Sequence, residues 1–372
     1  MILHIANDFN LTKVHKELYS NLDILGIKQK IFTPLRVETQ IGSNHFPFTQ
    51  DDSEYIYSDR LKKYHKIFFN EKINFLYKSL ISKIDCKQIT LTHATTLFSD
   101  GAIAYRLFKD YGIPYIVAVR NTDLNIYFKY RKNLIGLGKK ILLNAQKVVF
   151  ISDSNRFFFN NLSTLKNIKK VIENKSKVIN NGIDDFWLDN VQKFKKRDEG
   201  SFNFLFIGRF DSNKNVELLI DALKIFKNSS KNPVKLNLIG GTGNRHDSVL
   251  KKIAGQDWIQ YHGQIFSKEE LKNHYSANDF FSMISHTETF GLVYMEALSQ
   301  GLPLLYTKNQ GVDQAFTFNF GKAVDSKKIN NIVLQLEELC RNEYPLINDI
   351  DFEEYRWSNI AIKYLKIYNE NN

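Results

Sequence analysis

Short apolar segments and segments of helical period alternate along the first half of the chain. The apolar segments are MILHIA at the start, KQITLTH (87–93), PYIVAV (114–119) and KVVFIS (147–152). A stretch of helical period, GAIAYRLFKDYG (101–112), lies between two of them and ends at a glycine shortly before Pro114. Repeated alternation of strand and helix segments predicts a parallel sheet covered by helices.

A second alternating series follows a polar interruption. The segment around Asn180 to Asp184 contains a turn-forming Asn-Gly pair, and the residues after it are polar and charged. This composition predicts a first domain over 1–185, a linker over 186–200 and a second domain over 201–354. The apolar runs of the second series are FNFLFIG, VKLNLIGG, WIQYHG, FFSMIS and PLLYT, and a long amphipathic segment ends the chain.

Length and composition limit the class of protein. With 372 residues, 43% of them hydrophobic and 24% charged, the chain is expected to form two globular domains with a cleft, and not a disordered or fibrous protein. Cys86 and Cys340 are far apart and lack metal-ligand spacing, which favours a reduced, cytosolic setting. The start does not resemble a signal peptide, and no apolar run approaches membrane-spanning length.

The formal net charge of +11 favours anionic partners: nucleic acid, an anionic membrane face or phosphorylated substrates. No nucleic-acid recognition motif accompanies the charge, so we expect no nucleic-acid partner. The segment from Tyr127 to Lys147 is basic, contains aromatic residues and has no acidic residue. It predicts docking on an anionic membrane surface, with a solvated helix face as the alternative.

The stretch HTETFGLVYMEA (286–297) has the pattern of a strand, a turn and a helix, and it carries two carboxylates. Glu288 and Glu296 are too far apart to share one helical turn, so we expect one in the turn and one on the helix, both facing one crevice. Between them, Thr289, Phe290 and Gly291 place backbone N–H groups at a helix N-terminus, which attracts anions such as phosphate. The alternative is an ordinary strand-to-helix turn.

Two basic residues, Arg209 and Lys214, follow another predicted strand in FLFIGRFDSNKNVELL. We expect both in the same crevice as Glu288, where fixed positive charge would stabilise a pyrophosphate leaving group. Either residue alone could be a solvated surface cation. The runs IGGTGN (239–244) and GLGKK (136–140) lack the spacing of a dinucleotide fingerprint and a P-loop, and no His/Cys cluster has metal spacing.

These motifs resemble the retaining GT-B glycosyltransferases of family 4, also called glycosyl transferases group 1. The resemblance is carried by IGRFDSNKN, by ETFGLVYMEALSQGLP, by NNGID and by the closing YRWSNIAIKYLKIY. It implies an α/β fold of two Rossmann-like domains facing each other across a cleft. The final helix, at about 355–372, would cross back to complete the N-terminal, acceptor-side domain.

The resemblance also assigns residue roles. Arg209 and Lys214 would hold the donor diphosphate, Glu288 would meet the donor sugar, and these three form the predicted catalytic set. Glu296 would take the ribose hydroxyls, and backbone amides near Phe290 would cradle phosphate or sugar. The full predicted donor-binding set is Gly208, Arg209, Lys214, Gly241, Thr289, Phe290, Gly291, Leu292 and Glu296.

The first half departs from the family pattern on the acceptor side. It lacks the glycine-rich turn after the first strand, and it has Arg120-Asn121-Thr122-Asp123 where many relatives have a histidine before Gly-Thr-Asp. Either Arg120 takes the place of that histidine, or His93 does. The acceptor-side candidates, all expected in loops after strands, are Asn7, His93, Arg120 and Asp123, with a capping or loop role as the alternative for each.

The expected activity is therefore transfer of a sugar, with retention, from a UDP- or GDP-sugar to a hydroxyl of a glycan or a lipid-linked acceptor. The expected setting is bacterial capsule or lipopolysaccharide assembly in the cytoplasm, with peripheral attachment to the inner membrane face. We expect neither a metal nor a separate cofactor. The alternatives are a nucleotide-sugar epimerase on the same fold and a basic nucleic-acid-binding protein.

Overall fold

The computed structural model describes residues 1–194 and 200–370, which fold as two compact units. The first unit comprises Met1–Gly182 and the C-terminal residues from Tyr355 on, and the second comprises Ile183–Glu354. The expected linker, 186–200, overlaps helix α8 (Asp185–Asp189) of the second unit. Residues 195–199 of that stretch lie outside the described residues.

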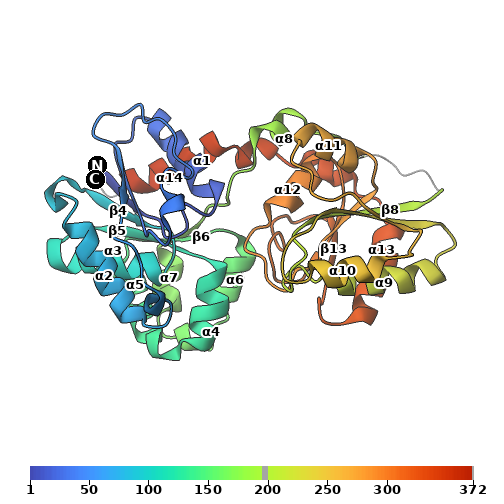
Figure 1. The fold of residues 1–372 in the computed structure, drawn as a ribbon, viewed down its shortest axis with the longest axis horizontal. Coiled ribbons are helices and arrows are strands. Elements are labelled where there is room, and N and C mark those ends of the chain that lie inside the picture. The colour runs from blue at the N-terminus through green and yellow to red at the C-terminus, as the bar shows by residue number, and fades with distance from the viewer. Residues whose placement is uncertain (195–199, 371–372) are drawn as a thin grey trace. The chain divides into compact units, whose positions relative to one another are not determined.

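The first unit is built on a seven-stranded parallel sheet with the order β3-β2-β1-β4-β5-β6-β7 (Figure 1). Its strands are β1 (Ile2–Ile5), β2 (Gln29–Thr33), β3 (Glu54–Tyr57), β4 (Leu91–Ala94), β5 (Tyr115–Val119), β6 (Lys147–Phe150) and β7 (Ser176–Val178). Every residue of β1 and β5 is buried. Burial on both faces explains why these strands are continuous apolar runs without alternation.

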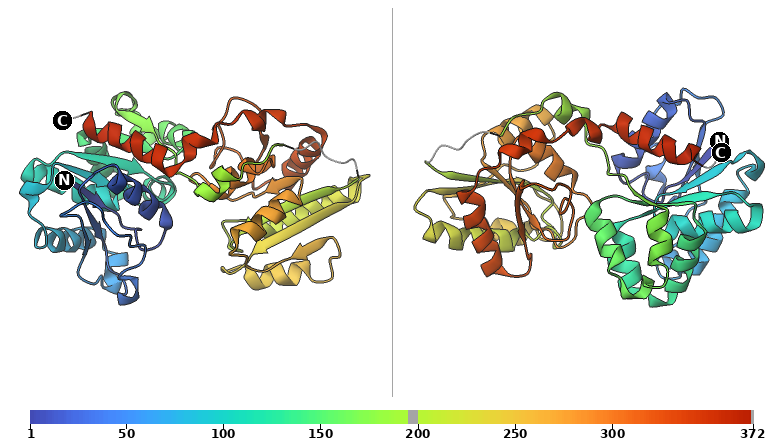
Figure 2. Two further views of the ribbon diagram at one scale, coloured as in Figure 1. Left: turned by 90° about the horizontal axis from the view of Figure 1, so that it is seen from above. Right: turned by 180° about the vertical axis from the view of Figure 1, so that it is seen from behind.

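Helices cover both faces of this sheet. They are α1 (Lys13–Ile24), α2 (Phe69–Ile81), α3 (Ser99–Tyr111), α4 (Phe128–Tyr130), α5 (Ile135–Asn144), α6 (Asp153–Asn160), α7 (Lys169–Asn174) and α14 (Trp357–Asn369). Helices α1 and α14 pack together on one face, and α2, α3 and α5 lie on the other (Figures 1 and 2). The predicted helix over 101–112 corresponds to α3, which ends at Gly112 with φ of 71° because glycine adopts the left-handed region at low cost.

The second unit repeats the plan with a six-stranded parallel sheet, order β10-β9-β8-β11-β12-β13. Its strands are β8 (Phe202–Gly208), β9 (Val234–Gly240), β10 (Ile259–Tyr261), β11 (Phe280–Ser282), β12 (Leu304–Thr307) and β13 (Gly321–Val324). Besides α8, its helices are α9 (Val216–Ser229), α10 (His246–Ile253), α11 (Lys268–Ser276), α12 (Leu292–Ser299) and α13 (Ile329–Arg341). The predicted α/β architecture with two parallel sheets is confirmed.

The strand order reverses once in each sheet. In the first unit the reversal lies between β1 and β4, and in the second between β8 and β11. Ligands of open parallel sheets bind beyond the carboxyl ends of the strands at this reversal. The loops after β8 and β11 are therefore the place to look for a site in the second unit.

Candidate functional site

The loop after β8 is a tight turn that carries Lys214 to the start of α9. The Asp211 carboxylate accepts hydrogen bonds from the backbone N–H groups of Asn213 and Lys214, at 3.0 and 3.1 Å. Asn215 then adopts a left-handed conformation with φ of 56°, and α9 begins at Val216. An aspartate whose side chain accepts a hydrogen bond from the backbone N–H two residues later commonly forms a turn. Asp211 therefore determines the position of Lys214 at the end of this turn.

The loop after β11 brings Glu288 to Lys214. The Lys214 Nζ donates to Glu288 Oε2 at 2.8 Å, and the two side chains are 21% and 17% exposed. The same ammonium group contacts the Met283 sulfur at 3.5 Å. The structure thus brings together two members of the predicted catalytic set, partly buried but still open to solvent, at the reversal point of the sheet.

Asn213 joins the two loops. Its Oδ1 accepts from the backbone N–H and the hydroxyl of Thr287, at 3.0 and 2.8 Å, and its Nδ2 donates to the Thr287 carbonyl at 2.9 Å. Its own carbonyl accepts from the His286 N–H at 2.8 Å. The sequence analysis did not identify Asn213. Its hydrogen bonds to Thr287 hold the loop of Glu288 next to Lys214.

A further loop, after β12, holds Glu288 from its other side. The Gln310 Oε1 accepts from the Glu288 N–H at 3.0 Å, and the Gly311 N–H donates to the Glu288 carbonyl at 3.0 Å. A Cβ on Gly311 would lie 3.1 Å from the Glu288 Cγ. The glutamate is therefore fixed by backbone contacts on both sides, which is the preorganisation that an electrostatic site requires.

Glycines let the ends of β8 and β9 approach closely. Gly240 has φ of 118°, and a Cβ there would lie 2.0 Å from the Gly208 carbonyl oxygen. Gly241 has φ of 120°, and its Cβ would meet the Tyr261 hydroxyl at 2.7 Å. The predicted donor-binding residues Gly208, at the end of β8, and Gly241, directly after β9, are thus neighbours, and the Gly241 N–H donates to the Gly208 carbonyl at 3.2 Å.

Helix α12 points its N-terminus at this loop cluster. Gly291 precedes it in a left-handed conformation, φ 78°, and a Cβ there would lie 2.4 Å from the Tyr294 ring. The Thr289 N–H donates to Glu288 Oε1 at 3.3 Å, Phe290 is buried, and Leu292 is the first helical residue. The first N–H groups of a helix have no partner within it and favour an anion.

The structure places Arg209 and Glu296 away from the ion pair. The Arg209 side chain is 69% exposed and lies 3.8 Å from the Asp211 carboxylate. Glu296, on α12, accepts from the Tyr275 hydroxyl at 3.4 Å. Burial raises the pKa of Glu296 to about 7, the charge of Asp184 also raises it, and Lys268 lowers it. Glu296 therefore faces α8 and α11, whereas Glu288 faces Lys214.

The acceptor-side candidates of the first unit are bonded within the fold. His93 lies inside β4, not in a loop after it; it is buried, and its Nδ1 is 2.9 Å from the Tyr368 hydroxyl of α14. Asp123 is buried and accepts from the N–H groups of Leu97, Phe98 and Arg120, at 3.0, 3.1 and 2.9 Å. Both side chains brace the structure around them.

Arg120 and Asn7 follow strands, as expected. The Arg120 Nε donates to the Thr95 carbonyl at 3.1 Å, which ties the end of β5 to the end of β4. Asn7 accepts from both terminal nitrogens of Arg36, through its carbonyl at 3.1 Å and its Oδ1 at 3.0 Å. Asn7 thus contacts a basic side chain.

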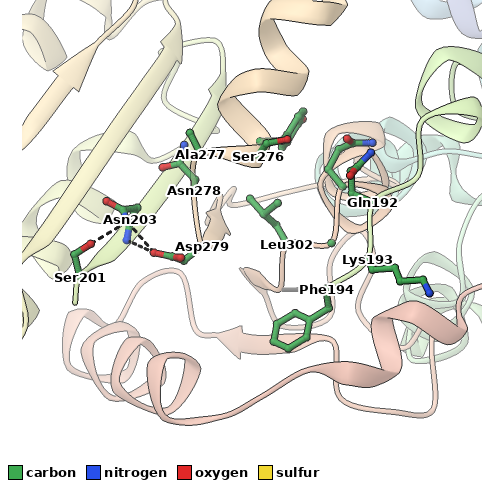
Figure 3. Close-up of a pocket in the computed structure, with 13 residues that line it drawn as sticks. Gln192, Lys193, Phe194, Ser201, Asn203, Ser276, Ala277, Asn278, Asp279 and Leu302 are labelled. Carbon is green, nitrogen blue, oxygen red and sulfur yellow. Dashed lines mark hydrogen bonds between the residues drawn. The ribbon is translucent and has the colours of Figure 1, made fainter. Parts of the chain in front are cut away.

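A polar hollow of about 240 Å³ lies elsewhere in the second unit (Figure 3). Asn203 lines it and donates from its N–H and its Nδ2 to Asp279, at 2.8 and 2.9 Å. Asn203 is in the amino-terminal part of β8 and Asp279 directly precedes β11. The hollow is therefore at the amino edge of the sheet, opposite the edge that carries Lys214 and Glu288.

Within the described ranges, no group of three or more His, Cys, Asp or Glu side chains could hold a metal ion. Across the same residues, no helix is both long enough and apolar enough to cross a membrane.

Comparisons with known proteins bear on the family and the fold of the chain. Residues 189–356 match the family model described as Glycosyl transferases group 1. A Klebsiella pneumoniae protein, "Uncharacterized 41.2 kDa protein in cps region", is 26% identical over 208 residues, which are 53% of this chain and 56% of that protein. The chain thus spans little more than half of that relative's length.

Two solved structures share the fold over nearly the whole chain. The lipopolysaccharide outer core galactosyltransferase WaaB, in its apo form, superposes with a TM-score of 0.73 at 13% identity over 100% of both chains. Anabaena Alr3699/HepE, in complex with UDP and glucose, gives 0.67 at 15% identity over 99% of both chains. The protein therefore has a GT-B fold.

Proposed function

We propose that this protein is a retaining glycosyltransferase that moves a sugar from a UDP- or GDP-sugar to a hydroxyl of a glycan or lipid-linked acceptor in bacterial surface polysaccharide assembly. The observation that carries the proposal is the partly buried Lys214–Glu288 ion pair at the strand reversal of the second sheet. Proteins of similar fold support it, since they include a lipopolysaccharide outer core galactosyltransferase and a protein in complex with UDP and glucose.

In this proposal Lys214 and Arg209 neutralise the charge that grows on the diphosphate as the bond to the sugar breaks. Glu288 accepts hydrogen bonds from the sugar hydroxyls while it keeps Lys214 in place, because a carboxylate has room for several donors. Glu296 takes the ribose hydroxyls. The amides at the start of α12 meet phosphate or sugar oxygens.

The proposal includes retention of the anomeric configuration and independence from divalent metal and from any separate cofactor. In this proposal Lys214 and the helix N-terminus supply the positive charge that a metal would otherwise supply, and the exposed Arg209 side chain turns toward the diphosphate when the donor binds. The proposed setting is the cytoplasm, with peripheral attachment to the inner membrane face.

The test begins with a thermal-denaturation screen of UDP- and GDP-sugars. A donor at one hundred times its Kd should stabilise the protein by about 2.7 kcal/mol. The donor found in this way is then incubated with acceptor extracts, and the product anomer is assigned by proton NMR. An acceptor-independent conversion of the donor would indicate an epimerase. An inverted product, or activity lost with EDTA and restored by magnesium, would contradict the proposed mechanism.

A further inference from the structure

The first unit contains a basic pocket of about 370 Å³. We use this name for the pocket lined by Arg36, Arg60, Lys66, Lys72 and Arg131, together with neighbouring lysines and a few apolar side chains. Among the described residues, no carboxylate side chain lines it. A pocket that gathers cations and omits carboxylates is suited to an anion with more than one charge.

The pocket lies at the carboxyl ends of β1, β2 and β3. Arg36 follows β2, Arg60 follows β3, and Asn7, which follows β1, links the pocket's side chains. The Asn7 Oδ1 accepts from the Arg36 guanidinium at 3.0 Å and from the Lys72 Nζ at 3.4 Å. Since binding sites of parallel sheets form at this edge, the basic pocket is placed where a ligand of the first unit is expected.

Lys72 is the least compensated of these cations. Its Nζ has long contacts, at 3.4 Å, to the Asn7 Oδ1 and the Ser99 hydroxyl, and no carboxylate in the described residues pairs with it. Burial lowers the pKa of Lys72, although Asp100 raises it. Burial also raises the pKa of Asp100 to about 7, which makes that carboxyl a weak counter-charge.

The other cations are only loosely balanced. Arg36 lies 3.6 Å from the Asp8 carboxylate, and Arg60 lies 3.8 Å from that of Glu38. The Arg131 guanidinium donates to the Ile67 carbonyl at 3.4 Å. Contacts this long leave much of each positive charge available, so an incoming anion would gain from these groups.

Apolar side chains contribute to the pocket lining, and others are exposed next to these residues in the sequence. Phe69 and Tyr127 line it, with ring centroids 5.9 Å apart. In the two segments that supply these residues, large apolar side chains are exposed: Ile67 by 66%, Phe68 by 57% and Tyr130 by 68%. Exposed apolar residues next to basic ones are the pattern of a surface that lies in a membrane interface.

We propose that the basic pocket binds the phosphate or diphosphate headgroup of a lipid-linked acceptor, while Ile67, Phe68 and Tyr130 enter the bilayer interface. The proposal rests on the proposed function, because it names the class of acceptor. The headgroup is held by charge and does not react, and the acceptor hydroxyl that receives the sugar lies elsewhere on the same molecule.

The test measures binding of the full chain to sedimented vesicles at low salt. The vesicles contain phosphatidylcholine alone, with phosphatidic acid, or with phosphatidylglycerol at equal total charge. A pocket variant, Lys72→Gln with Arg131→Gln, is compared with a control variant, Lys166→Gln with Lys170→Gln, which removes the same charge from exposed positions of the first unit outside the pocket and outside the 127–147 segment. Inorganic pyrophosphate serves as the soluble competitor, and circular dichroism verifies folding.

We expect wild type to bind phosphatidic acid vesicles more tightly than phosphatidylglycerol vesicles, and pyrophosphate to displace it. The pocket variant should bind about thirtyfold more weakly, because each basic residue near an anionic surface contributes about 1 kcal/mol. The control should lose no phosphatidic acid preference. Equal losses in both variants, or vesicle binding by a folded pocket variant equal to wild type, would overturn the proposal.

Binding of pyrophosphate without vesicle binding would also overturn it, since the ligand would then be a soluble phosphate. The pocket variant should keep the thermal stabilisation by nucleotide sugar. If wild type shows no donor stabilisation but the pocket variant still loses vesicle binding, the proposed function fails and the anionic lipid site stands.

Discussion

At the strand reversal of the second sheet, charged side chains stay open to solvent and hold one another across two loops. At the reversal of the first sheet, the polar side chains are buried, and the last helix packs against them. His4 of β1 and His93 of β4 are paired in register, and both lie against aromatic rings of Tyr19, Tyr364 or Tyr368. The same topology therefore holds a partly exposed ion pair in one unit and a buried polar cluster in the other.

The position of a residue in a Rossmann-like sheet therefore does not by itself define its role. Lys214 and Glu288 keep part of their surface accessible to a ligand. Asp123 is equally well placed in sequence, but its carboxylate already accepts three backbone N–H groups. A fully bonded buried carboxylate contributes to stability.

The largest expected effect is on stability in the second unit. Gly240→Ala would place a Cβ 2.0 Å from the Gly208 carbonyl oxygen, so unfolding should be easier by about 3 kcal/mol or more. Gly263→Ala is the matched control, because its φ of 71° is also positive but its Cβ would meet nothing within 4 Å. It should cost only about 1 kcal/mol. Urea denaturation measures both, and equal losses would refute the close approach.

The next effect is on catalysis. Lys214→Ala should lower kcat on the order of a hundredfold or more, because the ammonium group meets charge that develops only as the bond breaks. Lys224→Ala, an exposed lysine of α9, should leave kcat unchanged. The measurement is steady-state kinetics with the donor varied, after circular dichroism. If Lys214→Ala changes only KM, the residue binds donor without acting on the transition state.

The third prediction uses the buried polar core of the first unit. Burial lowers the pKa of His93 to about 3, and the charge of Arg120 lowers it further. The unfolded chain gains a proton near the ordinary value of about 6.5 and the folded protein does not. The stability that the neutral His93 contributes is therefore complete above that pH and is lost as the pH falls toward 3.

Between pH 6.5 and 5, His93 should account for a loss of roughly 1.6 kcal/mol in total, because the slope reaches its limit of about 1.4 kcal/mol per pH unit only well below pH 6.5. His93→Gln removes this slope, so its stability should fall less steeply than that of wild type over the same interval. Asp100, whose pKa burial raises to about 7, acts in the opposite direction in both proteins and cancels in the difference. Parallel pH profiles of the two proteins would show that His93 is not held neutral.

The smallest effect concerns donor binding. Glu296→Gln should raise the KM for donor about tenfold with little change in kcat, because ribose contacts do not alter during bond cleavage. Burial raises the pKa of Glu296 to about 7, so wild-type donor affinity should weaken below that pH as the protonated carboxyl loses acceptor capacity. The variant should lack that dependence. Glu269→Gln, exposed on α11, is the control. If Glu296→Gln lowers kcat and leaves KM unchanged, Glu296 does not bind the ribose of the donor.

Much of the fold could be predicted from the sequence, because strands buried on both faces are continuous apolar runs. The prediction lacked β2, β3, β7 and β13, where polar residues interrupt the pattern: β2 is QKIFT and β3 is EYIY. These strands lie at or near sheet edges. Strand β3 is only partly buried, whereas β2 is buried along its whole length and was missed because it begins with the polar residues Gln29 and Lys30.

The candidate site was predictable in the second unit because each element has a local signal: a turn aspartate, glycines at strand ends and a helix start. The role of Asn213 had no such signal, since its partners lie in a loop far along the chain. The basic pocket is likewise assembled from segments around Arg36, Lys72 and Arg131. Tertiary packing of distant segments leaves no pattern in one sequence.

The measurement that tests the central claim most directly is amide hydrogen exchange with and without the nucleotide sugar identified by the thermal screen. The donor should slow exchange in three stretches of the second unit, 208–214, 239–244 and 286–293, because their amides line the edge that carries Lys214 and Glu288. Exchange at β1 and β4 of the first unit should not change in the donor-only sample. Donor-dependent protection confined to the first unit, or absent from 286–293, would contradict the placement of the donor site.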